Sequence, residues 1–129
     1  MYVRFQARDA NQRGTFPGVF ALVNGLAAAG KLTPAQESFR RSSYDWYDAN
    51  LANPSDIDPT VYDRDLNHGA EAWFKESAAD HIAHVAGHLD ILALHGVGCD
   101  ILRSTDPGAV VYEDDHQIVV VPYQPSTQH

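Results

Sequence analysis

The histidines of this sequence are concentrated in one segment. Four of the seven are His81, His84, His88 and His95, at successive spacings of three, four and seven residues. An α-helix turns by about 100° per residue, so a helix here places all four on one flank of its apolar face. Imidazole binds transition metals and changes its charge close to neutral pH. This histidine stripe (His81, His84, His88 and His95) is therefore the part of the sequence best suited to chemistry.

Metal binding on the stripe would begin with His84 and His88. These two residues lie about 6 Å apart along a helix axis, and with His81 beside them they form the candidate metal site. His81 and His88 are about 10.5 Å apart by the same rule, so further ligands have to come from elsewhere in the chain. The segment differs from the zinc-protease motif, because Val85 stands where that motif has its catalytic glutamate. No cofactor is assured by these residues, and the one they allow is a divalent transition metal.

The same histidines also have explanations that need no metal. His95 precedes Gly96 at an expected helix C-terminus, where the helix dipole favours a protonated ring. A histidine beside a core can also simply pack its ring and donate to a carboxylate. A further alternative is a metal-free acid–base enzyme, in which a stripe histidine is paired with an acidic residue in a cleft between helix and loop. Packing, metal binding and acid–base chemistry all stay open at this point.

A second candidate surface combines tyrosines with carboxylates. Trp46 belongs to the apolar face of its expected helix, whereas Tyr44 and Tyr47 lie off that face and are expected to be exposed. Exposed aromatic residues are enriched in protein interfaces. Three consecutive carboxylates at the tip of an expected hairpin suit a basic partner or a hard cation, although a solvated turn has the same pattern. The candidate interaction surface consists of Tyr44, Tyr47, Glu113, Asp114 and Asp115.

Composition argues against several classes of function. The chain has 129 residues, only 9 lysines and arginines, and a net charge of −8. Nucleic acid is therefore not an expected partner, because a phosphate backbone needs a basic face. No apolar run approaches the ~18 residues that span a bilayer, so a membrane is not an expected partner either. Cys99 is the single cysteine, which favours a reducing, cytoplasmic location.

The elements of the N-terminal half follow from periodicity and turn residues. Residues 2–8 alternate between polar and apolar side chains, as in a half-buried strand. Pro17 and Gly30 mark the ends of a first helix. Thr33 caps a second helix, which ends before Pro54. Two helices joined by so short a turn form an antiparallel helical hairpin.

The C-terminal half combines a long loop, a third helix and three strands. The loop covers 53–69, and residues 70–75 are expected to form a helical turn that buries Trp73 or Phe74. The third helix is expected to start within 77–80 and to run as one helix to His95, with Val85 and Ala86 on its core face and the histidines on the flank. Strands are expected over 99–103, 109–112 and 117–121, the last two joined by the acidic hairpin.

These elements predict one α+β domain over 1–129, with a loose tail at about 123–129. An N-terminal strand, a helical hairpin and a third helix pack on one face of a four-stranded, mainly antiparallel sheet that the C-terminal β-hairpin completes. The expected function is that of a small acidic cytoplasmic protein, a non-enzymatic interaction module that binds a protein partner or a second copy of itself. The alternative is a metal-binding protein or metal-dependent enzyme that uses His81, His84 and His88.

Overall fold

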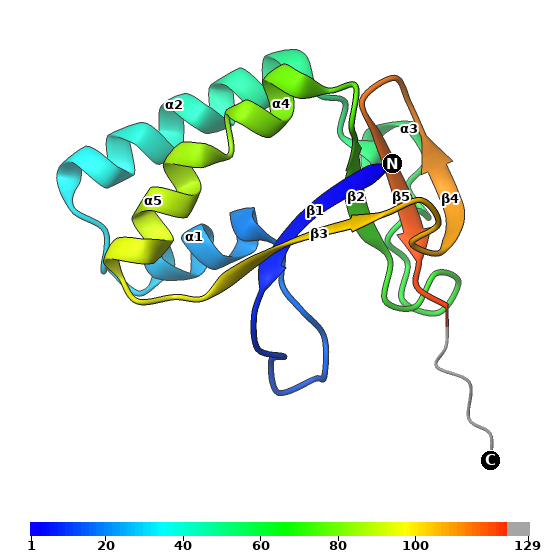
Figure 1. Cartoon of the computed structure of the whole chain (residues 1–129), viewed down its shortest axis with the longest axis horizontal. Helices are drawn as coiled ribbons and strands as arrows, with labels where there is room; N and C mark the ends of the chain where they lie inside the picture. Colours follow the sequence, from blue (N-terminus) through cyan, green and yellow to red (C-terminus); the bar gives the residue numbers. More distant parts are fainter. Residues whose placement is uncertain (124–129) are drawn as a thin grey trace.

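Five antiparallel strands form one sheet, in the order β3-β1-β2-β5-β4, in the computed structural model, which describes residues 1–123 (Figure 1). The strands are β1 (Tyr2–Ala7), β2 (Glu71–Lys75), β3 (Cys99–Ser104), β4 (Ala109–Glu113) and β5 (Gln117–Val121). The helices are α1 (Val19–Ala28), α2 (Pro34–Asn50), α3 (Pro54–Ile57), α4 (Ala79–Ala83) and α5 (Ala86–Leu94). The predicted α+β fold is therefore confirmed. Of the tail expected at 123–129, all but the first residue lies outside the described part of the chain.

The main hydrophobic core lies between the sheet and the helices. Val3, Phe5 and Ala7 of β1 are buried, and the residues between them are partly exposed, as the alternation predicted. A smaller cluster occupies the opposite face of the sheet. The main core contains Val3, Phe5, Val19, Val23, Tyr47, Phe74, Val85 and Leu92, and the smaller one contains Trp73, Ile118 and Val120.

One strand, β2, was not expected, because residues 70–75 were predicted to form a helical turn. Trp73 and Phe74 are both buried, Trp73 in the smaller cluster and Phe74 in the main core. Neighbouring side chains can enter cores on opposite sides only in a strand, where successive residues point to opposite faces. The prediction that one of the two aromatics would be buried by a helical turn was wrong, because it did not allow for a core on each face.

The sheet separates between β1 and β2. These strands are paired only at Tyr2 and Val3 of β1, whereas β3 pairs with β1 along its whole length. Beyond Val3, the place beside β1 is taken by the segment before α1, through a bridge between Gln6 and Gly18. The β3-β1 part of the sheet therefore diverges from the β2-β5-β4 part towards the C-terminal end of β1 (Figure 1).

The predicted third helix is interrupted. It consists of α4 and α5, separated at His84 and Val85, where Val85 N–H bonds to the carbonyl of Ile82, three residues back. The interruption changes which residues face the core: His81 and His88, predicted on the flank, are buried. The prediction of one continuous helix with the histidines on its flank was therefore wrong.

A close approach between α2 and α5 accompanies this interruption. Phe39 of α2 lies against Gly87, in the first turn of α5, and a Cβ atom on Gly87 would stand 2.2 Å from the Phe39 ring. Phe39 also contacts the ring of His88 edge-on, with ring centroids 5.2 Å apart. A side chain at this position would therefore require the phenyl ring to move.

We expect Gly87→Ala to lower the free energy of unfolding by about 1–3 kcal/mol, because the Phe39 ring has to move. Gly25, inside α1, has no atom near its missing Cβ. Gly25→Ala should therefore be neutral or stabilise the protein by up to about 1 kcal/mol. Urea unfolding of both variants measures the difference, and equal effects of the two substitutions would contradict this account.

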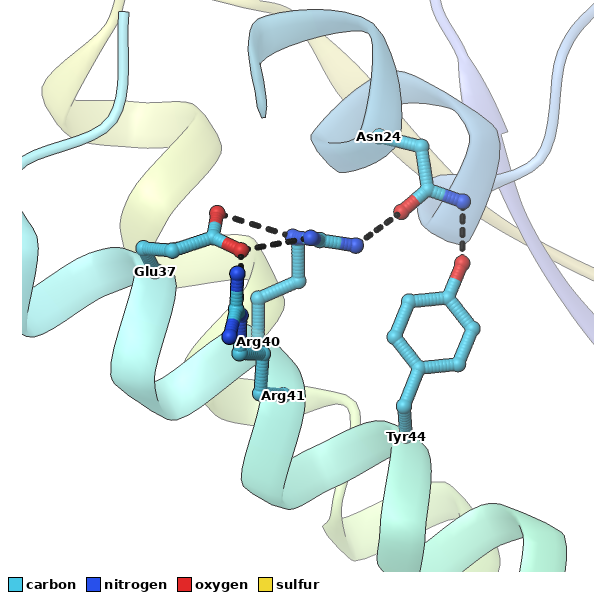
Figure 2. A network of polar contacts seen from close by, with 5 residues as sticks. All are labelled: Asn24, Glu37, Arg40, Arg41 and Tyr44. Carbon is cyan, nitrogen blue, oxygen red and sulfur yellow. Dashed lines mark hydrogen bonds and ion pairs between the residues drawn. The ribbon is translucent and has the colours of Figure 1, made fainter. Parts of the chain in front are cut away.

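Polar side chains connect α1 and α2 in the half of the pair nearest the turn between them (Figure 2). Thr33 and Gln36 form the predicted capping box at the start of α2. Arg40 and Arg41 both form ion pairs with Glu37, which lowers the pKa of this carboxyl to about 2. Asn24 of α1 bonds to Arg40 and Tyr44 of α2 and so connects the two helices; the set shown is Asn24, Glu37, Arg40, Arg41 and Tyr44.

Candidate functional site

The histidine stripe is divided among separate environments. His88 is buried, and its Nε2 lies 2.7 Å from the hydroxyl of Ser43 in α2. His81 is also buried, with Nε2 2.7 Å from the carbonyl oxygen of Asn50. Its ring stacks on His116 of the β4–β5 hairpin at a centroid distance of 4.3 Å. These two rings are therefore held by different parts of the fold.

The other two stripe histidines also have partners of their own. His84 is exposed, stacks on Trp46 at 3.5 Å, and has Nδ1 2.8 Å from the carbonyl oxygen of Asp80. His95 has Nε2 3.0 Å from the Gln36 side chain. Within residues 1–123, no three His, Cys, Asp or Glu side chains lie together in a way that could hold one ion. Metal binding by His81, His84 and His88 stays a prediction that this geometry does not support.

His88 is the stripe residue with the most unusual environment. Its Nδ1 is buried and has no hydrogen-bond partner among the described residues. The ring lies between Phe20 and Phe39, and burial lowers its pKa from 6.5 to about 4. Together with Ser43 it lines a pocket of about 240 Å³ between α1, α2 and the 51–54 segment. The ring is therefore neutral at pH 7.

His88 should make the stability of the protein depend on pH. The unfolded chain binds a proton at this residue near pH 6.5, whereas the folded chain binds it near pH 4. The free energy of unfolding should therefore have its full value above pH 6.5 and fall by an amount on the order of 2–3 kcal/mol as the pH decreases to 4. Urea unfolding of His88→Leu should show a weaker loss over this range. His68→Gln, at an exposed loop position, is the control, and an unchanged profile in His88→Leu would contradict the assignment.

The tyrosines of the candidate interaction surface are less exposed than expected. Tyr47 is buried in the main core, and its hydroxyl donates to the carbonyl of His81 at 2.7 Å. Burial raises the pKa of this phenol. Tyr44 is half-buried and bonds to Asn24. The expectation that Tyr47 is exposed was wrong, because Tyr47 reaches the space where α2 meets α4 and the sheet.

The acidic hairpin is built largely on internal contacts. Asp114 accepts hydrogen bonds from the backbone N–H groups of His116 and Gln117 and from the Tyr112 hydroxyl. Burial is the largest single influence on the pKa of this carboxyl and raises it. The hydrogen bonds together outweigh burial, so the pKa is lowered. Glu113 forms an ion pair with Lys75 at 2.6 Å. Asp115 is exposed. The predicted turn chemistry is present, and a role in binding a partner stays a prediction.

A large cleft opens where the two parts of the sheet separate. Its volume is about 710 Å³, within the range of small-molecule sites. One wall is the loop between β1 and α1, at 13–17, and the other is the segment before β2, at 62–71. Both loops extend from the same end of the sheet in Figure 1, the first in blue and the second in green. Leu102 of β3 and Pro122 after β5 complete the lining.

Arg4 lies at the base of this cleft. Its side chain is only 11% exposed, and its guanidinium donates to the carbonyls of Ala72 and Phe16 at 2.9 and 3.0 Å. Nε donates to Gln6 and lies 3.6 Å from the Glu71 carboxylate. Burial lowers the Arg4 pKa, the carboxylate opposes this effect, and an arginine stays protonated at neutral pH. Arg4 therefore joins the two walls and leaves a buried positive charge between them.

Two further arginines line the cleft without an internal partner. Arg13 and Arg64 are exposed, one on each wall, and neither guanidinium forms an ion pair or hydrogen bond with any residue from 1 to 123. The lining contains three arginines against one glutamate, a formal charge of +2 with His68 neutral, although the whole chain carries −8. The cleft therefore has a net positive lining in a protein whose overall charge is negative.

This cleft was not predicted from the sequence, because the residues that line it are spread from position 4 to position 122 and belong mostly to loops. One relevant feature was present in the sequence. Arg4 lies in a strand whose other face is apolar, so its side chain is on the face of the sheet opposite that core. No local spacing brings Arg13 and Arg64 together. They line the same cleft because β1 and β2 separate.

Comparisons of the chain with known protein families, with curated proteins and with solved structures find no match. No helix within residues 1–123 is long and apolar enough to cross a membrane.

Proposed function

We propose that this protein is a binding module for a small organic anion, which occupies the cleft between the 13–17 and 62–71 segments. The observation that carries the proposal is the position of Arg13 and Arg64. Both line one cleft, from opposite walls, and neither has an internal acceptor among the described residues. Guanidinium groups bind carboxylates and phosphates with paired hydrogen bonds, so two of them can hold one anionic group.

The remaining charges of the chain favour this use of the arginines. Arg8, Arg40 and Arg41 form ion pairs with carboxylates, and Arg4 has Glu71 at 3.6 Å. Arg103 has no ion pair among residues 1–123 either, but it lies outside the cleft. A carboxylate of the protein that paired with Arg13 or Arg64 would close the cleft to anions, and none does so among residues 1–123. The buried charge of Arg4 adds to the local potential, since charges act more strongly where water is partly excluded.

The size of the ligand follows from the overall charge. A long polyanion would extend past the cleft onto a protein surface with a net charge of −8, and would be repelled there. A small anion lies within the local field of the cleft alone. The sequence-based expectation was a non-enzymatic module that binds a protein partner through the tyrosines and the acidic hairpin. The present proposal is also non-enzymatic, but it replaces the protein partner with a small anion and places binding in the basic cleft.

A panel of small anions (pyrophosphate, citrate and ribose 5-phosphate) tests the proposal by thermal unfolding and calorimetry. A ligand at about a hundred times its Kd should raise the free energy of unfolding by about 2.7 kcal/mol. Arg13→Gln and Arg64→Gln should each weaken binding about tenfold, because each removes a charge-assisted hydrogen bond worth about 1.5 kcal/mol or more.

Arg103→Gln is the matched control for these variants. Arg103 is exposed, forms no ion pair among the described residues, and does not line the cleft. It should leave anion binding unchanged at constant ionic strength. The proposal is wrong if no anion of the panel binds, or if Arg103→Gln weakens binding as much as Arg64→Gln does.

A further inference from the structure

Each wall of the basic cleft carries an exposed aromatic side chain. Phe16, beside β1, is 40% exposed, and Tyr62, on the segment before β2, is 42% exposed. Both are among the residues that line the cleft with Arg13 and Arg64. Both side chains are therefore accessible to a ligand that enters the cleft. The cleft therefore offers two planar aromatic rings as well as two guanidinium groups.

We propose that the anion bound in this cleft is a nucleoside phosphate, with its base on Phe16 or Tyr62 and its phosphate on Arg13 and Arg64. This inference rests on the proposed function and specifies its ligand. A nucleoside phosphate has a flat aromatic system and a compact dianion in one small molecule. An aliphatic anion of similar charge would satisfy the arginines and leave both aromatic rings exposed to water.

The two kinds of contact differ in what they contribute. Stacking of a base on an aromatic side chain contributes about 1–3 kcal/mol and accepts any of the bases, because each has a π face. The phosphate contact depends on charge and weakens with salt. Affinity should therefore depend on both the ring and the phosphate, and little on which base is present.

The phenol of Tyr62 is suited to this environment. The part of the side chain that is buried raises its pKa further above the ordinary value near 10, and the nearby charge of Arg4 opposes that effect without reversing it. The hydroxyl is therefore neutral at physiological pH and adds no negative charge to the cleft. Its ring is available for stacking beside cationic groups, an arrangement that the quadrupole of an aromatic ring also favours.

The size and charge of the protein favour a mononucleotide over a nucleic acid strand. The cleft volume of about 710 Å³ accommodates one base, its sugar and its phosphate. The lining places three arginines within this cleft, whereas the chain as a whole is acidic. A single-stranded polymer needs a positive groove that follows its backbone over several nucleotides, which the net charge of −8 does not provide.

Isothermal calorimetry with the full chain at low salt tests this inference. The ligands are AMP, GMP, CMP and UMP, with ribose 5-phosphate and adenosine as the two halves of AMP. We expect at least one nucleotide to bind ten times or more as tightly as ribose 5-phosphate, and adenosine to bind more weakly than AMP by a similar factor. Tyr62→Leu or Phe16→Leu should remove most of the advantage of the nucleotide, and leave binding of ribose 5-phosphate within about twofold of the original protein.

Tyr123→Leu is the aromatic control, because Tyr123 is 60% exposed and does not line the cleft. Thermal unfolding without ligand shows which variants are folded, and the two leucine variants test the inference independently if one of them fails to fold. Equal binding of nucleotides and ribose 5-phosphate, or binding of citrate or pyrophosphate alone, would overturn the nucleotide assignment and leave the proposed anion site standing. Adenosine binding as tightly as AMP would overturn it as well. Failure of every anion to bind would overturn both proposals.

Discussion

The architecture of the cleft depends on one buried cation. β1 and β2 are adjacent strands that pair at only two positions, and such a separation leaves backbone carbonyls without strand partners. Arg4 compensates for this by donating to Ala72 on one side and to Phe16 on the other. An apolar side chain at position 4 could fill the same space but would leave those carbonyls unsatisfied. The guanidinium thus replaces missing strand pairing, and its own charge is partly balanced by Glu71.

The helical side of the protein follows a different constraint, the burial of histidines. His81 and His88 enter the core because the helix is interrupted between them, at His84 and Val85. Each buried ring keeps one hydrogen bond, His81 to the backbone of Asn50 and His88 to Ser43. A neutral imidazole with one satisfied nitrogen costs much less to bury than a charged one. The buried histidines of the stripe thus pack α2 against α4 and α5, and the burial of His88 makes the stability of the protein depend on pH.

Much of the fold could be predicted from local patterns, and the failures share a physical cause. The alternation in β1, the capping box at Thr33 and the final hairpin are local signals, and each appears in the structure. β2 was missed because Trp73 and Phe74 are buried on opposite faces of a sheet. This pattern can be interpreted as a strand only if both faces of the sheet are known to have cores. The interruption before α5 was missed because it accompanies the contact of Phe39 with Gly87, which are 48 positions apart. Long-range packing overrides helical periodicity in both cases.

The candidate site was harder to predict than the fold, because the role of each arginine depends on whether the fold places a carboxylate beside it. The sequence shows seven arginines in an acidic chain but does not show which of them are neutralised. Arg40 and Arg41 are adjacent in the sequence, and both pair with Glu37 within their own helix. Arg13 and Arg64 lie in polar loops that resemble ordinary turns. They are distinguished only once the separation of β1 from β2 brings their loops to one cleft, with Arg4 already satisfied at its base. A positive charge that the fold neither buries nor pairs, placed beside two exposed aromatic rings, is the feature that internal stability leaves unexplained and that a ligand would explain.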